Sequence, residues 1–408
     1  MSSLIAEHGG AMLHLDVTQS CRSANSSGVQ VVTRSLYRAL AVRTAVEPLA
    51  WDSLLQCYVH LSASEIDRLE TPFPKKYRPA IRPNKQDNPP WKTFARSMLR
   101  LSRRMRWQDF RQPGTIMFFP EVFRDARVQL LPRKLASCVA TAAIFHDACV
   151  LKFPEHTPAM RSRNFLEYAT YAASRDLVVC ISRETKKDLE QFILPKVDSP
   201  GRIKVDAWPV ERPLCMPEIP SPRDEGPLLL CVSTLGYQKN HLGLLEAAES
   251  LWKDGIHFRL ELIGQADQTW SEGVILRVDQ LRASGRNLRW LRHVDNTTLV
   301  ERYGQATFTV YPSRHEGFGL PILESLAHGK PCICGSNGAI GEASSDGGCL
   351  QVDQNDPDAL ARGIRRLLED KTLVKQLRAE ALDRNLGSWD DYAKRFLECL
   401  DNIPASPN

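Results

Sequence analysis

The stretch His315-Glu-Gly-Phe-Gly-Leu-Pro-Ile-Leu-Glu324 joins a strand-like run, residues 306–313, to a short helical pattern that ends at Gly329. Pro321 suits the first turn of this helix, and Gly329 suits its C-terminal cap. Glycines directly before a helix let backbone N–H groups approach an anionic ligand, and the helix dipole favours the negative charge. The stretch therefore predicts a binding turn between a strand and a helix.

Two glutamates flank this turn, Glu316 before the glycines and Glu324 in the helix. Carboxylates beside a bound phosphate would repel it, so hydrogen bonds from sugar or ribose hydroxyls are the better use of these side chains. The residues alone thus indicate a site for a sugar nucleotide.

Length and composition indicate an ordinary two-domain protein. The chain has 408 residues, which suits two domains, with 43% apolar and 25% charged residues. Its eleven cysteines form no C-x-x-C pair, so buried free thiols in a reducing cytosol are expected rather than a zinc ribbon. Since the sequence contains no run of about 18 apolar residues, we expect a cytoplasmic protein.

Two series of alternating strand and helix patterns follow each other along the chain. The first opens with a strand at residues 12–17 and a helix at 29–43, and the second with a strand at 227–234 and a helix at 240–252. The proline-rich residues 195–224 separate the two series. We therefore expect an α/β protein with two doubly wound, Rossmann-like domains.

Three residues at the ends of predicted strands are candidates for the site. Gly28 either lets a ligand approach the backbone or serves only as a turn glycine. His146 ends the strand at residues 140–145, where it would orient a substrate or donate a hydrogen bond to a leaving oxygen. Lys239, at a junction between a strand and a helix, is placed to neutralise the charge of a phosphate.

A basic segment, residues 73–111, interrupts the first series. Lys75 to Arg111 carry four Lys, eight Arg and two Asp, a net charge of +10. The second half predicts a helix with an apolar stripe and interleaved arginines, namely Trp91, Phe94, Met98, Leu101 and Met105 with Arg96, Arg100, Arg103, Arg104 and Arg106. Such a helix either lies on an anionic membrane surface or packs on its own domain. Nucleic acid is not an expected partner, because no nucleic-acid module accompanies the charge.

Taken together, these motifs resemble the retaining nucleotide-sugar glycosyltransferases of the GT-B fold, family 4. The family signature is a glutamate, seven residues and a second glutamate around a G-F-G-L-P core, as in Glu316 to Glu324. Residues 233–241 are similar to the family's donor-phosphate loop, and residues 295–313 to the helix and strand before the signature. The N-terminal half resembles the family at Asp16-Val17, Ser27-Gly28-Val29-Gln30, His146-Asp147 and Pro154-Glu155.

The resemblance implies a GT-B architecture, with two Rossmann-like domains that face each other across a cleft. Residues 1–205 would bind the acceptor and contain the basic insert, residues 73–111. Residues 206–388 would bind the donor, and residues 389–408 would form a helix that packs back on the N-terminal domain.

The resemblance also implies roles for individual residues. Glu316 would contact the donor sugar, Glu324 would accept the ribose hydroxyls, and Lys239 would stabilise the departing diphosphate, with His146 as a further catalytic residue. The other donor contacts would come from Gly28, Thr234, His293, Val294, Phe318, Gly319 and Leu320. Thr234 stands where many relatives carry an arginine.

No metal or other cofactor is expected. Lys239 would do what a metal ion does in transferases with a D-x-D motif. The one D-x-D in the chain, Asp356-Pro-Asp358, opens a helix, so capping explains it better than metal binding.

The implied reaction is transfer with retention through an oxocarbenium-like transition state, by front-face displacement. A GDP-mannose-like donor is favoured over a UDP-sugar, and the acceptor would be a polysaccharide, a lipopolysaccharide or a lipid-linked sugar at the inner face of the plasma membrane. Two alternatives are a GT-B phosphorylase or nucleotide-sugar epimerase, and a non-catalytic nucleotide-sugar-binding scaffold at the membrane.

Overall fold

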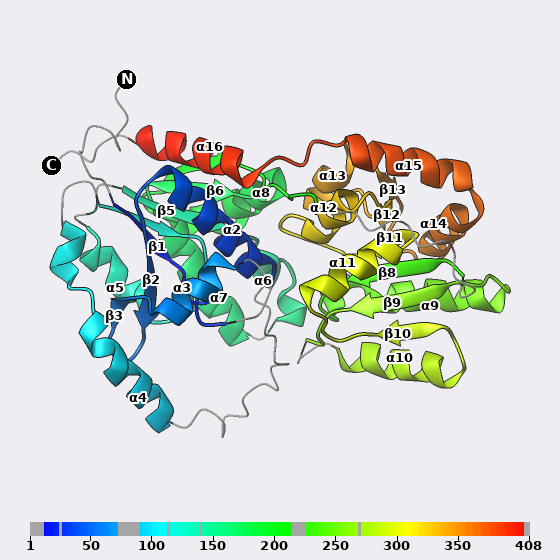
Figure 1. Cartoon of the computed structure of the whole chain (residues 1–408), viewed down its shortest axis with the longest axis horizontal. Helices are drawn as coiled ribbons and strands as arrows, with labels where there is room; N and C mark the ends of the chain where they lie inside the picture. The colour runs from blue at the N-terminus through cyan, green and yellow to red at the C-terminus, as the bar shows by residue number, and fades with distance from the viewer. Residues whose placement is uncertain are drawn as a thin grey trace. The chain divides into compact units, whose positions relative to one another are not determined.

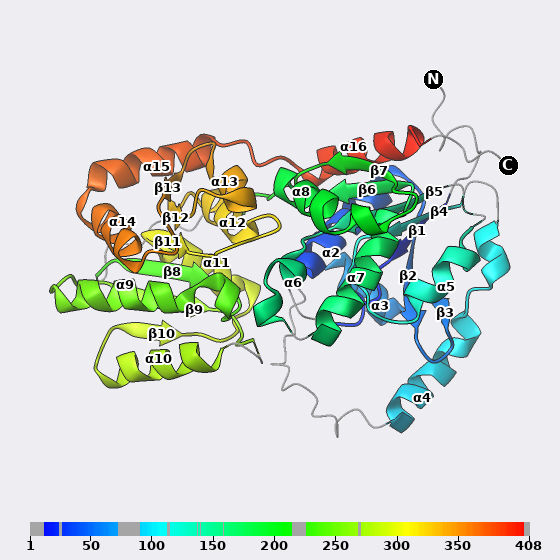
Figure 2. The same cartoon turned by 180° about the vertical axis from the view of Figure 1, so that it is seen from behind.

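The computed structural model of the protein describes residues 12–23, 27–71, 90–111, 115–136, 138, 140–157, 159–213, 226–267 and 271–403. The chain divides into two compact units, each a sheet flanked by helices (Figures 1 and 2). The first unit comprises Met1–Ile181, Thr185–Trp208 and Ser388–Asn408, and the second comprises Ser182–Glu184 and Pro209–Gly387. The predicted basic loop before Pro90 lies outside the described residues.

The first unit is built on a seven-stranded sheet with the order β3-β2-β1-β4-β5-β6-β7. Its strands are β1 (Leu13–Asp16), β2 (Val46–Asp52), β3 (Cys57–His60), β4 (Ile116–Phe119), β5 (Ala140–Phe145), β6 (Leu177–Cys180) and β7 (Arg202–Val205). Neighbouring strands are parallel, except that β2 and β3 pair antiparallel at the edge. The middle strands β4 and β5 are apolar except for Thr141, because helices cover both faces of a parallel sheet.

Eight helices flank the first sheet in the described part of the chain. They are α2 (Gly28–Arg43), α3 (Ala63–Glu70), α4 (Pro90–Arg100), α5 (Arg127–Lys134), α6 (Cys149–Lys152), α7 (Ala159–Ala173), α8 (Arg183–Phe192) and α16 (Trp389–Asp401). Phe165, Tyr168 and Leu189 from these helices join strand residues such as Phe119 and Phe145 in one apolar core.

The last helix, α16, belongs to the first unit although it follows the second unit in sequence. Phe396 of α16 stacks on Phe118 of β4, with ring centroids 4.3 Å apart. Arg43 at the end of α2 forms an ion pair with Asp390 in the first turn of α16. Trp389, Tyr392 and Phe396 are buried, so the expected return of the final helix to the N-terminal domain is what the structure shows.

The second unit contains a six-stranded parallel sheet with the order β10-β9-β8-β11-β12-β13. Its strands are β8 (Leu228–Val232), β9 (Arg259–Ile263), β10 (Leu288–Trp290), β11 (Phe308–Tyr311), β12 (Cys332–Cys334) and β13 (Cys349–Gln351). The helices are α9 (His241–Lys253), α10 (Glu272–Ala283), α11 (Asn296–Gln305), α12 (Leu320–Ala327), α13 (Gly338–Ser344), α14 (Pro357–Glu369) and α15 (Lys371–Asp383). This strand order is that of a Rossmann domain, so the expected fold class is confirmed for both units.

Aspartate side chains cap the starts of two helices in the second unit. The Asp295 side chain accepts a hydrogen bond from the Thr298 N–H at the start of α11. Asp356 accepts from the Asp358 N–H at the start of α14, so the D-x-D motif is a helix cap, as expected.

The structure corrects the prediction for the second half of the basic segment. The helix α4 ends at Arg100, and a 3₁₀ turn (Leu101–Arg103) follows it. Met105 is buried beyond the helix, where its N–H donates to the carbonyl of Tyr58 on β3. The continuous stripe from Trp91 to Met105 therefore does not exist, because a helix of that length would pull Met105 away from the sheet edge.

The arginines of this segment also divide into two groups. Arg100 is buried and paired with carboxylates of its own unit, and Arg103 is half-buried and paired with Glu65. The prediction that these two arginines contact a membrane is therefore wrong. Arg96 and Arg104 are exposed. The side chain of Trp91 lies outside the described part of the structure. None of the helices within the described ranges combines the length and apolarity needed to span a bilayer.

Candidate functional site

The candidate site lies at the centre of the second sheet, where the winding reverses between β8 and β11. In doubly wound sheets, ligands bind outside the carboxyl ends of the strands at this switch point. The loops that leave these two ends are residues 233–240 and 312–319. They carry Lys239 and Glu316, which the sequence analysis assigned to one site.

Gly319 fixes the turn that leads into α12. Its φ is 95°, in the left-handed region, and a Cβ added there would lie 3.1 Å from the Cβ of Ala343. Pro321 occupies the first turn of the helix. At the other end, Gly329 and Lys330 donate to the carbonyls of Leu326 and Ser325, a Schellman cap that confirms the predicted helix end.

One oxygen of Glu316 is the centre of the site. Its Oε1 accepts from the ammonium of Lys239 at 2.5 Å, from the hydroxyl of Tyr311 at 2.7 Å and from the hydroxyl of Ser313 at 2.5 Å. Lys239 Nζ also lies 3.2 Å from the hydroxyl of Tyr311. The side chains of Glu316 and Lys239 are 12% and 22% exposed, so this ion pair is only partly screened by solvent and remains reachable by a ligand.

Further hydrogen bonds join the two loops. The Gln238 side chain donates to the carbonyl of His315 at 2.5 Å, and the Gln238 carbonyl accepts from the N–H of Arg314 at 2.8 Å. The Arg314 guanidinium donates to the side-chain oxygens of Asn240 and Asn355 at 2.6 and 3.0 Å. Because each loop holds the other, Lys239 and Glu316 are positioned by a common frame.

Glu324 lies one turn into α12, half-buried beside Tyr303. The Tyr303 hydroxyl donates to Glu324 Oε2 at 3.3 Å, and the Tyr303 ring stacks on His328 with centroids 4.5 Å apart. Burial raises the pKa of the Glu324 carboxyl to about 7. Ligand hydroxyls that donate hydrogen bonds to the ionised carboxylate would stabilise this form and lower the pKa again.

The remaining predicted donor residues are placed as follows. Thr234 is exposed directly after β8, and His293 and Val294 lie half-buried in the loop between β10 and α11. Val294 packs beside the buried cluster around Leu230 and Tyr303. Phe318 is buried, Leu320 begins α12, and burial lowers the pKa of His293. The structure therefore brings Lys239, Glu316 and the turn at 317–320 together.

His146 lies at the carboxyl end of β5 in the first unit. Its Nε2 is 2.8 Å from the carbonyl of Pro120, and its ring centroid is 5.4 Å from that of Trp208. Because a carbonyl only accepts, Nε2 carries the proton, and burial lowers the pKa of the imidazole. In the neutral ring Nδ1 is therefore an acceptor, and it has no partner among the described residues. Of the two roles expected for His146, orienting a substrate hydroxyl fits this tautomer, whereas donating to a leaving oxygen does not.

Gly28 is the exposed first residue of α2 in the first unit. In the same unit, at the switch point between β1 and β4, the buried carboxylate of Glu121 accepts from the N–H groups of Gln19 and Ser20 at 2.6 and 2.8 Å. Burial raises the pKa of Glu121 to about 7. This carboxylate fixes the loop that leads from β1 towards Gly28.

Sequence reasoning missed Tyr311, Ser313, Tyr303 and Glu121. A signal for the first two was present, since Tyr311 ends β11 and Ser313 follows two positions later, on the same side as an extended chain continues. Tyr303 and Glu121 had no comparable signal, because their partners come from distant segments.

Comparison with known proteins adds a family to this geometry. A family model described as "Glycosyl transferases group 1" matches residues 216–384, which span nearly all of the second unit. Residues 216–384 form a group 1 glycosyltransferase domain. The resemblance is thereby confirmed at the level of glycosyl transferases group 1 for this domain, and the ion pair of Lys239 and Glu316 lies within it.

A curated relative of the chain is the O-antigen chain mannosyltransferase B of Escherichia coli, which is 29% identical over 248 residues. This match covers 59% of the chain and 63% of the relative, slightly less than two thirds of the relative's own length.

Solved structures share the fold of the whole chain. Sucrose-phosphate synthase from Thermosynechococcus elongatus matches with a TM-score of 0.68 at 18% identity, over 97% of this chain and 100% of that one. The Anabaena protein Alr3699/HepE, in complex with UDP and glucose, matches with a TM-score of 0.63 at 16% identity, over 97% and 100% of the two chains. The group 1 domain thus sits in a chain with the two Rossmann-like domains of the GT-B fold.

Proposed function

We propose that the protein is a retaining glycosyltransferase that moves a hexose from a nucleoside diphosphate to a polysaccharide, lipopolysaccharide or lipid-linked acceptor. The observation that carries this proposal is the ion pair of Lys239 and Glu316 at the switch point of a group 1 domain. One cation and one carboxylate in contact suit a ligand that carries phosphate charge and sugar hydroxyls side by side.

In this proposal the donor separates the pair and satisfies both members. The diphosphate attracts Lys239, and the sugar hydroxyls donate to the Glu316 carboxylate that Tyr311 and Ser313 continue to hold. A nucleotide without a sugar would take Lys239 and leave Glu316 with fewer donors. The site therefore favours the complete sugar nucleotide over the free diphosphate.

The same contacts would assist the departure of the diphosphate. Negative charge grows on the leaving oxygen during transfer, and Lys239 and the N-terminus of α12 offer fixed positive charge to it. With Lys239 in this role the proposal includes no metal ion. Glu316 is held as an acceptor of hydroxyl hydrogens, so we infer front-face displacement, in which a leaving phosphate oxygen takes the proton of the acceptor hydroxyl.

His146 would accept a hydrogen bond from a hydroxyl of the donor sugar through Nδ1. Its neighbour Trp208 and the carbonyl of Pro120 fix the ring, so the direction of this bond is set before the ligand arrives. Glu324 would accept the ribose hydroxyls.

Mannose is the favoured sugar and GDP the favoured nucleotide. The support is the likeness to a curated mannosyltransferase, whose name also gives an O-antigen chain as its product. A UDP-sugar is the second candidate, because a structure of the same fold contains UDP and glucose. The ten described cysteines are free thiols, seven of them buried, which suits a cytoplasmic site of action.

The test begins with thermal shifts for GDP-mannose, GDP, UDP-glucose and UDP. We expect GDP-mannose to raise the melting temperature most, and to raise it more than GDP does. Transfer from the best donor to a mannan oligosaccharide is then followed by NMR, and the coupling constant at the new anomeric carbon is expected to match that of the donor. Inversion at this carbon, or no response to any nucleotide sugar, would overturn the proposal.

The alternative enzymes and the scaffold are separated by the products. A phosphorylase would release a sugar 1-phosphate and a shortened chain from a saccharide and inorganic phosphate, with no nucleotide sugar present. An epimerase would yield a new nucleotide sugar without any acceptor. A scaffold would bind the donor and release no nucleotide under any condition. We expect nucleotide release that depends on a saccharide acceptor.

A further inference from the structure

The helix α4 packs on the first unit through its polar side. The Ser97 hydroxyl donates to the Asp52 carboxylate at 2.9 Å, and Arg100 lies 3.3 Å from the same carboxylate. Arg100 also pairs with Glu65 on α3, and Arg103 lies 3.1 Å from Glu65. Buried ion pairs with several hydrogen bonds fix a helix in one orientation, because rotating it would leave these charges unpaired. The arginines that face the protein therefore fix the orientation of α4.

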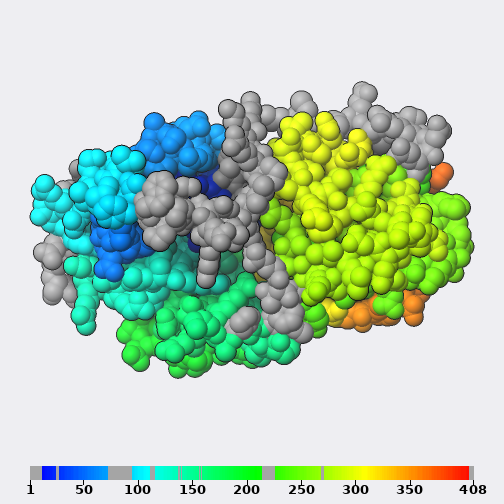
Figure 3. Space-filling view, turned by 90° about the horizontal axis from the view of Figure 1, so that it is seen from below, coloured from blue at the N-terminus to red at the C-terminus, as the bar shows by residue number. Residues whose placement is uncertain are grey.

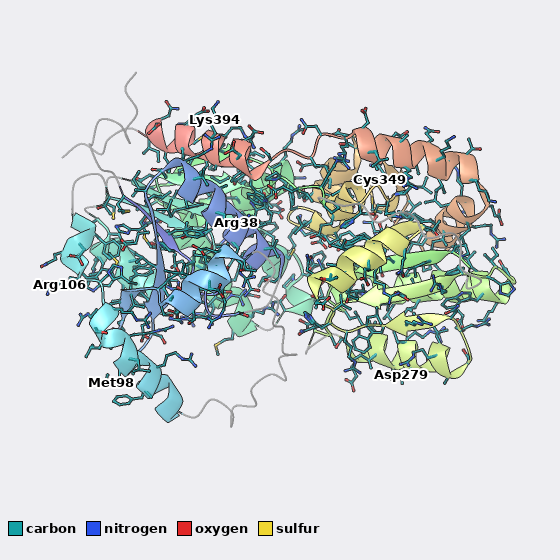
Figure 4. The ribbon with its side chains drawn as sticks, viewed as in Figure 1. Arg38, Met98, Arg106, Asp279, Cys349 and Lys394 are labelled. Carbon is teal, nitrogen blue, oxygen red and sulfur yellow. The ribbon has the colours of Figure 1, made fainter. Side chains whose placement is uncertain are left out.

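The apolar side of α4 and of the 3₁₀ turn that follows it faces outwards. Phe94, Met98, Leu99 and Leu101 are 55%, 43%, 76% and 49% exposed. They account for four of the twelve exposed large hydrophobic side chains in the described part of the chain, within eight consecutive residues. Figure 4 shows Met98 on the side of α4 away from the sheet, and in Figure 3 the cyan atoms of this segment form part of the surface of the first unit. A gathered apolar patch of this kind marks a contact with another phase or molecule.

Exposed basic residues accompany this patch in sequence. Arg96, Arg104 and Arg106 are exposed, and Arg106 extends from the surface in Figure 4. In sequence, no carboxylate occurs between Asp87 and Asp109, and five further basic residues precede α4, namely Lys75, Lys76, Arg78, Arg82 and Lys85. The local charge is thus positive without compensation from the outer side of the helix.

We propose that α4 docks the protein on a membrane surface that carries anionic lipid headgroups. Phe94, Met98 and Leu99 would enter the boundary between headgroups and acyl chains, while Arg96, Arg104 and Arg106 would contact lipid phosphates. An anionic lipid surface is the occupant that supplies both a continuous apolar layer and negative charge along its border. The ion pairs of Arg100 with Asp52 and Glu65 keep the apolar side of α4 facing outwards, where it can contact the membrane.

The test uses the full chain and sedimentation with phosphatidylcholine vesicles, with and without phosphatidylglycerol. We expect binding only to vesicles that contain phosphatidylglycerol, and weaker binding at high salt. The double variant Phe94→Glu/Leu99→Glu is expected to reduce the partition coefficient by at least about tenfold. Leu276→Glu is the matched control, because Leu276 is 61% exposed on α10 of the other unit, and its binding should equal that of the parent.

A charge-reversal pair separates lipid phosphate from apolar contact alone. Arg96→Glu/Arg104→Glu should also lower partition by at least about tenfold, whereas Lys253→Glu/Arg282→Glu, at exposed positions in the second unit, should not. Circular dichroism confirms that each variant melts as the parent does.

Three results would overturn the proposal. Equal binding to neutral and anionic vesicles would show that lipid charge plays no part in binding. Equal binding of the parent and Phe94→Glu/Leu99→Glu would show that the apolar patch plays no part. Light scattering would show a second copy of the chain on α4 instead if the parent were a dimer and this double variant a monomer. None of these measurements uses transferase activity, so their outcome is independent of the proposed function.

Discussion

The ammonium nitrogen of Lys239 lies 2.5 Å from Oε1 of Glu316, although 77 positions separate the two residues in sequence. The contact exists because β8 and β11 are neighbours in the sheet, so the loops that follow them meet at its carboxyl edge. The same oxygen accepts from Tyr311 and Ser313. The two loops thus keep the cation and the carboxylate in contact, where a donor could bind both.

Loss of either member of this pair should remove transfer while the fold remains. Lys239→Ala deletes the positive charge beside the leaving diphosphate, and Glu316→Ala deletes the acceptor of the sugar hydroxyls. We expect kcat to fall by about 10²-fold or more for each variant, as for the loss of other preorganised electrostatic groups. Steady-state kinetics with the best donor measures this change.

Lys253→Ala is the control for charge removal, because Lys253 is 63% exposed at the end of α9. Its kcat should equal that of the parent. Full activity of Lys239→Ala and Glu316→Ala together with this control would show that the pair lies outside the reaction.

Tyr311→Phe should show what the third donor contributes to the position of Glu316. The substitution removes one hydroxyl from Glu316 Oε1 and keeps the buried ring, so we expect a fall in kcat of about tenfold. Tyr171→Phe is matched to it, since Tyr171 is buried and its hydroxyl has no hydrogen-bond partner among the described residues. A parallel fall in both variants would indicate a general effect of removing a buried hydroxyl.

The pKa of Glu324 predicts how donor affinity depends on pH. Its folded value of about 7 exceeds the ordinary value of 4.5, so its protonated form stabilises the unliganded protein, and this contribution is lost as pH rises through 7. Ribose hydroxyls donate best to the ionised form. We therefore expect nucleotide affinity to rise between pH 6 and pH 8, by at most about tenfold per pH unit.

Isothermal titration in buffers of different ionisation enthalpy measures this affinity and the proton released. Glu324→Gln should bind weakly and with little dependence on pH over the same range. An affinity of the parent that falls with rising pH would contradict the assignment of Glu324 to the ribose hydroxyls.

Gly319→Ala should strain the turn before α12. The left-handed φ of 95° costs a residue with a Cβ about 1–2 kcal/mol, and the added carbon would lie 3.1 Å from Ala343. We expect the free energy of unfolding to fall by at least about that amount, with weaker donor binding. Gly273→Ala, in α10 with open space around the added carbon, should instead stabilise the protein by up to about 1 kcal/mol. Urea unfolding compares the two variants.

Much of the second unit could be predicted from sequence because its signals are local. The run from Phe308 to Gly329 contains a strand, a glycine turn, a proline in the first turn and a glycine cap, and the structure has each of them. The hydrogen bond that Tyr303 gives to Glu324 could not be predicted, because it joins two helices, α11 and α12, whose contact no local pattern reveals.

The basic segment shows the opposite case. Apolar spacing alone leaves two possibilities. Either Phe94 and Met98 pack inwards and the arginines remain in solvent, or the apolar stripe and its arginines lie on an anionic membrane. Ser97 and Arg100 instead bind the carboxylates of Asp52 and Glu65, more than 30 positions earlier in sequence. The polar side of the helix therefore faces the protein, and its apolar side faces outwards. Such an orientation depends on tertiary partners that no local pattern contains.

The most direct test of the account is isothermal titration of GDP and GDP-mannose, or of the best donor and its nucleotide, into Lys239→Ala and Glu316→Ala. We predict that Lys239→Ala lowers the affinity for both ligands. Glu316→Ala should lower the affinity only for the sugar nucleotide, because free GDP lacks the hexose that Glu316 would contact. Unchanged affinity of both variants for both ligands would contradict the claim that Lys239 binds the diphosphate and Glu316 the sugar.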